Sequence, residues 1–192
     1  MIDVEEITKR YAETVAVDRL SFQVEKGEIL GLLGPNGAGK TTTMRILTGY
    51  LAADSGKVTV AGLDLRDHSL EIRRLIGYLP ENNPLYPDMG VMEYLLFIAA
   101  MRGLPKTGRR NRIDRVIELT GLEKMAHKNI GELSKGYCQR VGLAQAIVHD
   151  PEILILDEPT VGLDPNQIVE IRSLIQRFGA DKTIILSSHI LP

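Results

Sequence analysis

Residues 34–41, GPNGAGKT, constrain the fold more than any other stretch of this sequence. They match the pattern G-x-x-x-x-G-K-[ST], directly follow the apolar run ILGLL (29–33) and lead into the helical pattern TTTMRIL (41–47). Such a loop turns backbone N–H groups toward a phosphate, and the helix N-terminus adds partial positive charge. The alternative is a glycine-rich turn that contains Gly-Lys-Thr by chance, but the flanking strand and helix are the context that the motif requires. The sequence therefore predicts a nucleoside triphosphate site formed by Gly34, Pro35, Asn36, Gly37, Ala38, Gly39, Lys40, Thr41 and Thr42.

Individual residues of this loop have separate predicted roles. Gly34, Gly37 and Gly39 have no Cβ and let the backbone approach the phosphate oxygens closely. Lys40 is predicted to reach the β- and γ-phosphates, which gives it a catalytic role as well as a binding role. The Thr41 hydroxyl is predicted to ligate Mg²⁺.

The stretch ILILDEPT (153–160) predicts a second part of the same site. Its four apolar residues show no alternation, which is typical of a strand buried on both faces. Asp157 follows at the strand end, where its carboxylate is predicted to hold Mg²⁺ through water. Glu158 comes next and is predicted to orient the attacking water as the catalytic base. The alternative is an acidic turn after a strand.

The order of apolar runs predicts a doubly wound α/β core. Helical patterns begin after Gly39, at Ser69 and at Pro165, where Asp164 is the expected N-cap. Strand-like runs are absent from 83–149, and we interpret this segment as an inserted helical lobe. We therefore expect one domain over 1–192, with its α/β core in 1–82 and 150–192. The expected strands lie at 2–7, 20–24, 29–33, 57–60, 75–79, 153–156 and 183–187, and the expected helices of the lobe at 91–101, 110–119 and from Ser134 onward.

Composition limits the classes of function. With 44% hydrophobic and 25% charged residues, the 192-residue chain has the ordinary composition of a globular domain. Its formal net charge of −2 does not indicate nucleic acid or an anionic membrane as the main partner. Cys138 is the only cysteine, so no intrachain disulfide can form and a reducing compartment is expected. The most apolar stretch, YLLFIAAM (94–101), is far shorter than the roughly 20 residues that a membrane helix needs.

Five motifs, taken in order, resemble those of the nucleotide-binding subunits of ABC transporters: GPNGAGKT, LSKGY (133–137), ILILDEPT, VGLD (161–164) and SSH (187–189). The resemblance extends from Val4 to His189 and covers nearly the whole chain. Within that family the chain is most similar to subunits of type 2 exporters. Three stretches are also similar to the ATPase associated with bacterial gliding motility: LPENNPLY (79–86), LSKGYCQRVGLAQAI (133–147) and LDPNQIVEIR (163–172).

The resemblance implies a P-loop NTPase fold with a mostly parallel sheet, an N-terminal antiparallel β subdomain and the inserted helical lobe. It implies binding and hydrolysis of ATP with Mg²⁺, and head-to-tail pairing with a second copy or a paralogous ATPase subunit. Polytopic membrane permease subunits would be the partners that hydrolysis drives, and nucleic acid is not expected as a partner. The implied location is cytoplasmic, at the inner face of the cell membrane. Family members continue past the histidine of SSH, so we expect the chain to be truncated at its C-terminus.

The resemblance also assigns residues outside the two motifs. Tyr11 is expected to stack on the adenine base, although a tyrosine there can also be a plain surface or core residue. His189 matches the switch histidine that contacts the γ-phosphate, and so belongs to the predicted catalytic set. Ser134, Lys135, Gly136 and Asp164 are expected at the dimer interface. Ser134 and Gly136 are expected to contact the nucleotide of the other subunit, and Ser134 to cap its own helix while no nucleotide is there.

Two of the motifs depart from the family pattern. Glu81 stands in LPENNP where the family usually has glutamine, and it is predicted to face the metal. When ionised, a glutamate only accepts hydrogen bonds, and it adds negative charge near the metal. Lys135 and Tyr137 replace the glycine and glutamine of LSGGQ. Lys135 is predicted to strengthen ATP-dependent pairing through an extra positive charge beside the phosphate.

Three alternatives stay open at the level of sequence. The chain can be a nucleotide-gated clamp or motility component in which ATP binding, not transport, is the output. A GTP switch is disfavoured because no N-K-x-D motif is present. The basic cluster RRNR (109–112) can touch a membrane subunit or anionic lipid, but we favour the outer face of a helix whose Ile113, Val116 and Ile117 point inward.

Overall fold

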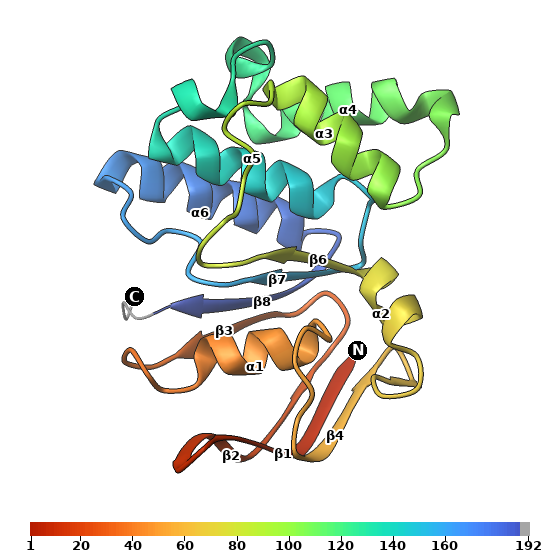
Figure 1. Ribbon diagram of the computed structural model, residues 1–192, viewed down its shortest axis with the longest axis vertical. Helices are drawn as coiled ribbons and strands as arrows, with labels where there is room; N and C mark the ends of the chain where they lie inside the picture. Colours follow the sequence, from red (N-terminus) through yellow and green to blue (C-terminus); the bar gives the residue numbers. More distant parts are fainter. Residues whose placement is uncertain (189–192) are drawn as a thin grey trace.

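Two sheets form the framework of the molecule, and the computed structural model describes residues 1–188 of it (Figure 1). The antiparallel sheet has the order β2-β1-β4-β5, with β1 (Ile2–Tyr11), β2 (Thr14–Val24), β4 (Ser55–Val60) and β5 (Leu63–Asp64). The second sheet has the order β3-β8-β7-β6 and is parallel throughout, with β3 (Ile29–Leu33), β6 (Ile76–Leu79), β7 (Ile153–Leu156) and β8 (Thr183–Ser188). The predicted α/β fold with an antiparallel N-terminal part is confirmed, and the two-residue strand β5 was not predicted.

The helices agree with the sequence pattern with one exception. The exception is α4, which begins four residues before the predicted start and contains two non-helical residues, Thr107 and Gly108. In chain order the helices are α1 (Lys40–Leu47), α2 (Ser69–Leu75), α3 (Val91–Met101), α4 (Lys106–Thr120), α5 (Lys135–Ile147) and α6 (Pro165–Gly179), with short 3₁₀ turns at Glu123–Met125 and Ile130–Glu132. None of the helices within residues 1–188 is long and apolar enough to cross a membrane.

The parallel sheet is buried on both faces, as its unalternating apolar strands predict. Along β7 and β8, alternate side chains enter two different clusters. Ile153, Ile155 and Ile185 pack with α1 and the antiparallel sheet. Leu154, Leu156 and Ile184 pack with α5, α6 and the helices of the lobe. Figure 1 shows the result, with α1 between the two sheets and α5 and α6 on the other face of the parallel sheet.

The direction of the strands decides where the helices begin. Because β3, β7 and β8 are parallel, they end at one edge of the sheet, and α1 and α6 start from that edge. Helix α5 precedes β7 and runs the opposite way, so its N-terminus lies at the same edge, on the left in Figure 1. The fold therefore gathers the N-termini of α1, α5 and α6 on one side of the molecule.

The C-terminal end of α5 is fixed against the sheet. A Cβ on Gly77 of β6 would lie 2.1 Å from the carbonyl oxygen of Ala146, so the helix contacts the strand without an intervening side chain. Thus α5, although it belongs to the predicted lobe 83–149, packs directly on the core. The boundaries of the lobe stay a prediction.

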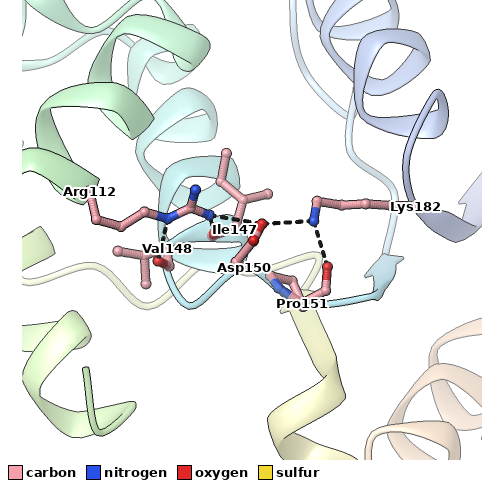
Figure 2. Close-up of polar contacts among 6 residues, drawn as sticks. All are labelled: Arg112, Ile147, Val148, Asp150, Pro151 and Lys182. Carbon is pink, nitrogen blue, oxygen red and sulfur yellow. Dashed lines mark hydrogen bonds and ion pairs between the residues drawn. The ribbon is translucent and has the colours of Figure 1, made fainter. Parts of the chain in front are cut away.

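Three charged residues hold the chain that leaves α5 (Figure 2). Arg112 of α4 donates to the carbonyl oxygens of Ile147 (2.7 Å) and Val148 (3.0 Å), and to Asp150 Oδ1 (3.2 Å). Lys182 reaches the same Asp150 oxygen at 3.1 Å from the other side. Partial burial raises the pKa of Asp150, but the Lys182 hydrogen bond and the Arg112 charge outweigh this, and the pKa lies below its ordinary value. The network joins the lobe, the end of α5 and the start of β8.

The basic cluster 109–112 therefore makes internal contacts. Arg109 donates to the Leu104 carbonyl, and Arg110 pairs with Asp114. The apolar residues on the inner face of the helix, Ile113, Val116 and Ile117, are buried as predicted.

Candidate nucleotide-binding site

The loop before α1 has a backbone that only glycine fits at one position. Gly39, the N-cap of α1, has a φ of +84°, and a Cβ there would lie 2.2 Å from the carbonyl oxygen of Ala16. Gly37 has a φ of +83°, also in the left-handed region that glycine favours. Because the N-cap is a glycine, it has no side-chain acceptor for the N–H groups of the first turn. These groups and the helix dipole face the loop, as an anion site requires.

A cleft of about 560 Å³ opens above this loop. Tyr11 from the end of β1 is 45% exposed and forms one wall, while Glu81 and Glu158 contribute the acidic groups. The lining residues are Tyr11, Ala16, Asn36, Gly37, Ala38, Gly39, Lys40, Thr41, Thr42, Glu81, Glu158 and Val161. The structure thus brings most of the predicted nucleotide-binding residues together with two predicted acidic residues.

Other predicted residues lie elsewhere. Gly34 and Pro35 are not part of the cleft lining, but their carbonyl oxygens accept hydrogen bonds from Lys40 Nζ at 2.7 and 3.1 Å. Asp157 is fully buried beside Glu158. The residues expected at a dimer interface, Ser134, Lys135, Gly136 and Asp164, do not line the cleft. His189 lies outside the described residues.

Lys40 links the phosphate loop to the acidic segment after β7. Its Nζ lies 3.5 Å from Glu158 Oε1, and the two side chains are only 9% and 8% exposed. An ion pair so shielded from water is screened far less than one at the surface. The pair therefore fixes both groups at the floor of the cleft.

Asp157 and Glu158 are also tied to β8 by one hydroxyl group. Ser187 Oγ donates to Asp157 Oδ1 at 2.7 Å and accepts from the Glu158 backbone N–H at 2.8 Å. Among residues 1–188, Asp157 Oδ2 is buried without a hydrogen-bond partner, which suits a carboxylate oxygen meant for a cation or its water. Burial and the negative charge of Asp157 raise the pKa of the neighbouring Tyr78 to about 12, so its hydroxyl stays protonated.

The hydroxyl and carboxylate oxygens present here fit Mg²⁺ better than they fit a metal ion that is coordinated by protein side chains alone. Residues 1–188 contain no cluster of three or more His, Cys, Asp and Glu side chains that could form a cage. Mg²⁺ typically binds through one or two protein oxygens together with phosphate oxygens and water. Thr41 at the start of α1 and Asp157 are the residues that would hold it, and Glu81 faces the same cleft.

The N-terminus of α5 differs from its prediction. Ser134 occupies the N-cap position with φ −63° and ψ 159°, but its hydroxyl makes no capping hydrogen bond. The predicted side-chain cap is therefore wrong: the backbone adopts the N-cap conformation, while Oγ is not directed at the first-turn N–H groups. Ser134 is exposed. Gly136 is buried against Gln167 of α6, and a Cβ added there would lie 2.7 Å from that side chain. Lys135 turns toward its own chain, since a Cβ on Gly162 would lie 2.0 Å from Lys135 Nζ.

The cap of α6 is confirmed. The Gln167 N–H donates to Asp164 Oδ1 at 2.9 Å, and the Asp164 N–H donates to Gln167 Oε1 at 3.4 Å. Pro165 follows at the first helical position, as predicted.

Sequence reasoning missed two residues of this region. Ser187 lies in the SSH motif, where only the histidine received a role. Gln139 is buried on α5 and donates from Nε2 to the carbonyl oxygen of Pro159 at 2.8 Å. A polar residue within the otherwise apolar and small-residue stretch of α5 is the signal that could have indicated it.

Comparison with known proteins agrees with this geometry. The family model described as "ABC transporter" matches residues 17–161. The bacitracin transport ATP-binding protein BcrA of Bacillus licheniformis is 42% identical over 193 residues, which cover 100% of this chain and 62% of that protein. The Nod factor export ATP-binding protein I of Burkholderia pseudomallei (strain 1710b) is 41% identical over 194 residues, 99% of this chain and 63% of that protein. A solved dimeric ATP-binding cassette in a post-hydrolysis state, bound to ADP and Pi, superposes with a TM-score of 0.88 at 25% identity, over 99% of this chain and 88% of that one.

The chain belongs to the ABC transporter family, as one of its ATP-binding domains. The predicted resemblance to the nucleotide-binding subunits of ABC transporters is confirmed at the level of the family. The chain spans less than two thirds of the length of the two curated relatives.

Proposed function

We propose that this chain hydrolyses ATP, with Mg²⁺ as cofactor, in the cleft above the phosphate loop. The observation that carries the proposal is the buried contact between Lys40 and Glu158, which places a phosphate-binding cation beside a carboxylate on the floor of the cleft. In the proposed site the loop and Lys40 bind the phosphates, and Thr41 and Asp157 hold Mg²⁺. Glu158 orients the attacking water. Tyr11 stacks on the base, and Glu81 faces the metal side.

The site takes its remaining part from a second chain. Ser134 and Gly136 do not line this chain's own cleft, yet Ser134 is exposed at a helix N-terminus suited to an anion. Two subunits paired head to tail would each offer this helix end to the γ-phosphate held by the other, with Lys135 and Asp164 at the interface. The dimeric form of the related cassette supports this arrangement.

Export is the process that the proposed ATPase serves, through polytopic membrane permease subunits. Its support is the export and transport named for the two relatives. A location at the inner face of the membrane follows from such partners. The link to gliding motility remains a prediction from the sequence, because neither relative is named for it.

The test of the proposed function is the substitution Glu158→Gln. It removes the proposed base but keeps the shape of the side chain, so we expect MgATP hydrolysis to fall about 10²-fold or more. ATP should then convert the variant from monomer to stable dimer, measured by light scattering coupled to size-exclusion chromatography. Glu152→Gln is the matched control, since Glu152 lies at the opposite end of β7 and pairs with Lys26 at the surface. Hydrolysis at the parental rate by Glu158→Gln would remove Glu158 from the role of base.

The main alternative, a nucleotide-gated clamp, uses the same site without transport. Purification of the full-length protein from membranes separates the two, because an export subunit is expected to copurify with a polytopic membrane protein. Competition between ATP and GTP for the cleft tests the GTP switch. Preferential binding of ATP excludes it, and preferential binding of GTP supports it.

A further inference from the structure

Glu158 is held in an unusual backbone conformation. Its φ of +48° lies in the left-handed region, which L side chains other than Asn and Asp rarely adopt. The residue that follows is Pro159, which further restricts the conformations of the residue before it. Strained residues of this kind persist only where the surrounding contacts fix them. The contacts that fix Glu158 therefore determine where its carboxylate points.

Two buried side chains bracket this residue. On its amino side the Glu158 N–H donates to Ser187 Oγ at 2.8 Å. On its carboxyl side Gln139 Nε2 donates to the Pro159 carbonyl at 2.8 Å, and Gln139 is only 8% exposed. Pro159 is buried and has no N–H of its own, so this carbonyl is its sole backbone hydrogen-bonding group. Removing the donor would leave a buried carbonyl unpaired, and the segment would shift to regain a partner.

We propose that Gln139 is a positioning residue that fixes the Glu158 carboxylate for hydrolysis by holding the Pro159 carbonyl. The inference rests on the proposed ATPase function of the same cleft. Gln139 itself does not line the cleft, so it acts through the Pro159 segment rather than by touching the nucleotide. The loop and Lys40 carry the affinity for ATP. Loss of the Gln139 contact therefore lowers kcat and leaves KM for ATP unchanged.

The neighbouring contacts of α5 touch the chain after Glu158 at two further residues, Gly162 and Gln167. Gly136 packs under Gln167, and Lys135 Nζ lies against Gly162. Together with Gln139 these contacts come from the first two turns of α5, directly after Ser134. The helix end that the second subunit's nucleotide is proposed to meet is thus joined to the segment that carries this chain's own Glu158.

The test compares kcat and KM for MgATP, together with the melting temperature, in three variants of the chain. Gln139→Leu removes the donor. Gln139→Met keeps roughly the length of the side chain but has no hydrogen-bond donor. Gln145→Leu is the matched control: Gln145 lies on the same helix and accepts a hydrogen bond from the Tyr94 hydroxyl, away from Glu158.

We expect both Gln139 variants to lower kcat about tenfold or more, because small displacements of a catalytic group have effects of this size or larger. KM should stay within about twofold of the parental value, and Gln145→Leu should lower the melting temperature without changing kcat. Parental kcat in the folded Gln139 variants, an equal rise in KM, or the same loss in Gln145→Leu would each overturn the inference while the proposed function stands. Failure of the parent chain to hydrolyse MgATP would instead remove the proposed function, and the inference with it.

Discussion

Helices α5 and α6 begin side by side at the same edge of the sheet, but their N-termini differ in one respect. The first turn of α6 is closed by the reciprocal hydrogen bonds of Asp164 and Gln167. The first turn of α5 follows an exposed serine whose hydroxyl makes no such bond. Helix α1 resembles α5, since its N-cap is a glycine without any side-chain acceptor. Among these three helices, which begin at the same edge of the sheet, the two without a side-chain cap are those proposed to meet phosphate. Helices α2 and α4 also lack a side-chain cap hydrogen bond, so a missing cap alone does not identify a phosphate site.

This difference has an energetic meaning. A side-chain cap stabilises a protein by about 1 kcal/mol. Helices α1 and α5 forgo that stabilisation and leave their N–H groups for another acceptor. At α1 and α5 the missing cap agrees with the phosphate sites that the sequence motifs predict.

The most severe test of the comparison is Lys40→Met at the uncapped end of α1. The substitution keeps the aliphatic stem but removes the charge that is proposed to bind the β- and γ-phosphates. We expect the affinity for a fluorescent ATP analogue to fall about a hundredfold. Lys26→Met, which removes an exposed lysine at the other edge of the sheet, is the control. Unchanged affinity in Lys40→Met would show that the α1 end is not the phosphate site.

The second test is Ser134→Ala at the uncapped end of α5. Because the hydroxyl makes no capping bond, we expect the melting temperature of the nucleotide-free chain to stay unchanged. The ATP concentration for half-maximal dimerisation, measured by light scattering in the Glu158→Gln background, should rise about tenfold, the value of one hydrogen bond to a charged group. A loss of monomer stability instead would mean that Ser134 is a structural cap.

The third test is Asp164→Ala at the capped end of α6. We expect a loss of about 1 kcal/mol of unfolding free energy, seen as a decrease of roughly 2–4 °C in the melting temperature of the nucleotide-free chain. Asp164→Asn, which retains an acceptor oxygen, should recover most of that loss. If alanine is as stable as aspartate, the contrast between α5 and α6 has no energetic basis.

The smallest expected effect belongs to Lys135→Gly. Its ammonium lies against Gly162 of its own chain and is exposed, so its field at a partner's phosphate is weakened by solvent. We expect a two- to threefold rise, on the order of surface electrostatic effects, in the ATP concentration needed for dimerisation. The effect should vanish at about 1 M salt. Dimerisation at the parental ATP concentration in low salt would make Lys135 a tolerated surface residue.

Sequence patterns predicted most of the elements because their signals are local, but β1 continues to Tyr11 rather than ending at residue 7, and β2 begins at Thr14 rather than at residue 20. The apolar runs of β7 and β8 and the Asp164-Pro165 start of α6 each depend on a few neighbouring residues. Strand β5 was missed because two residues, Leu63 and Asp64, carry no periodicity.

The interior of the candidate site was only partly predictable. Motif spacing indicated Lys40, Asp157 and Glu158. The hydrogen bond of Glu158 to Ser187 and that of Gln139 to Pro159 depend on chain segments brought together by folding. The Ser134 side-chain cap was wrongly predicted because residue type specifies the N-cap backbone, whereas the direction of a hydroxyl depends on its surroundings.

The contact between Gly77 and Ala146 fixes the C-terminal end of α5 on the parallel sheet. Its C-terminal end is clamped, by close packing on β6 and by Arg112 on its last carbonyls. The thirteen residues from Lys135 to Ile147 form a rod roughly 20 Å long, and at its other end Gln139 and Gly136 contact Pro159 and Gln167. A small rotation of α5 about its C-terminal end would move its N-terminal residues by a larger distance. A methyl group added at Gly77 would therefore change the position of Ser134 as well as the packing of α5 on β6.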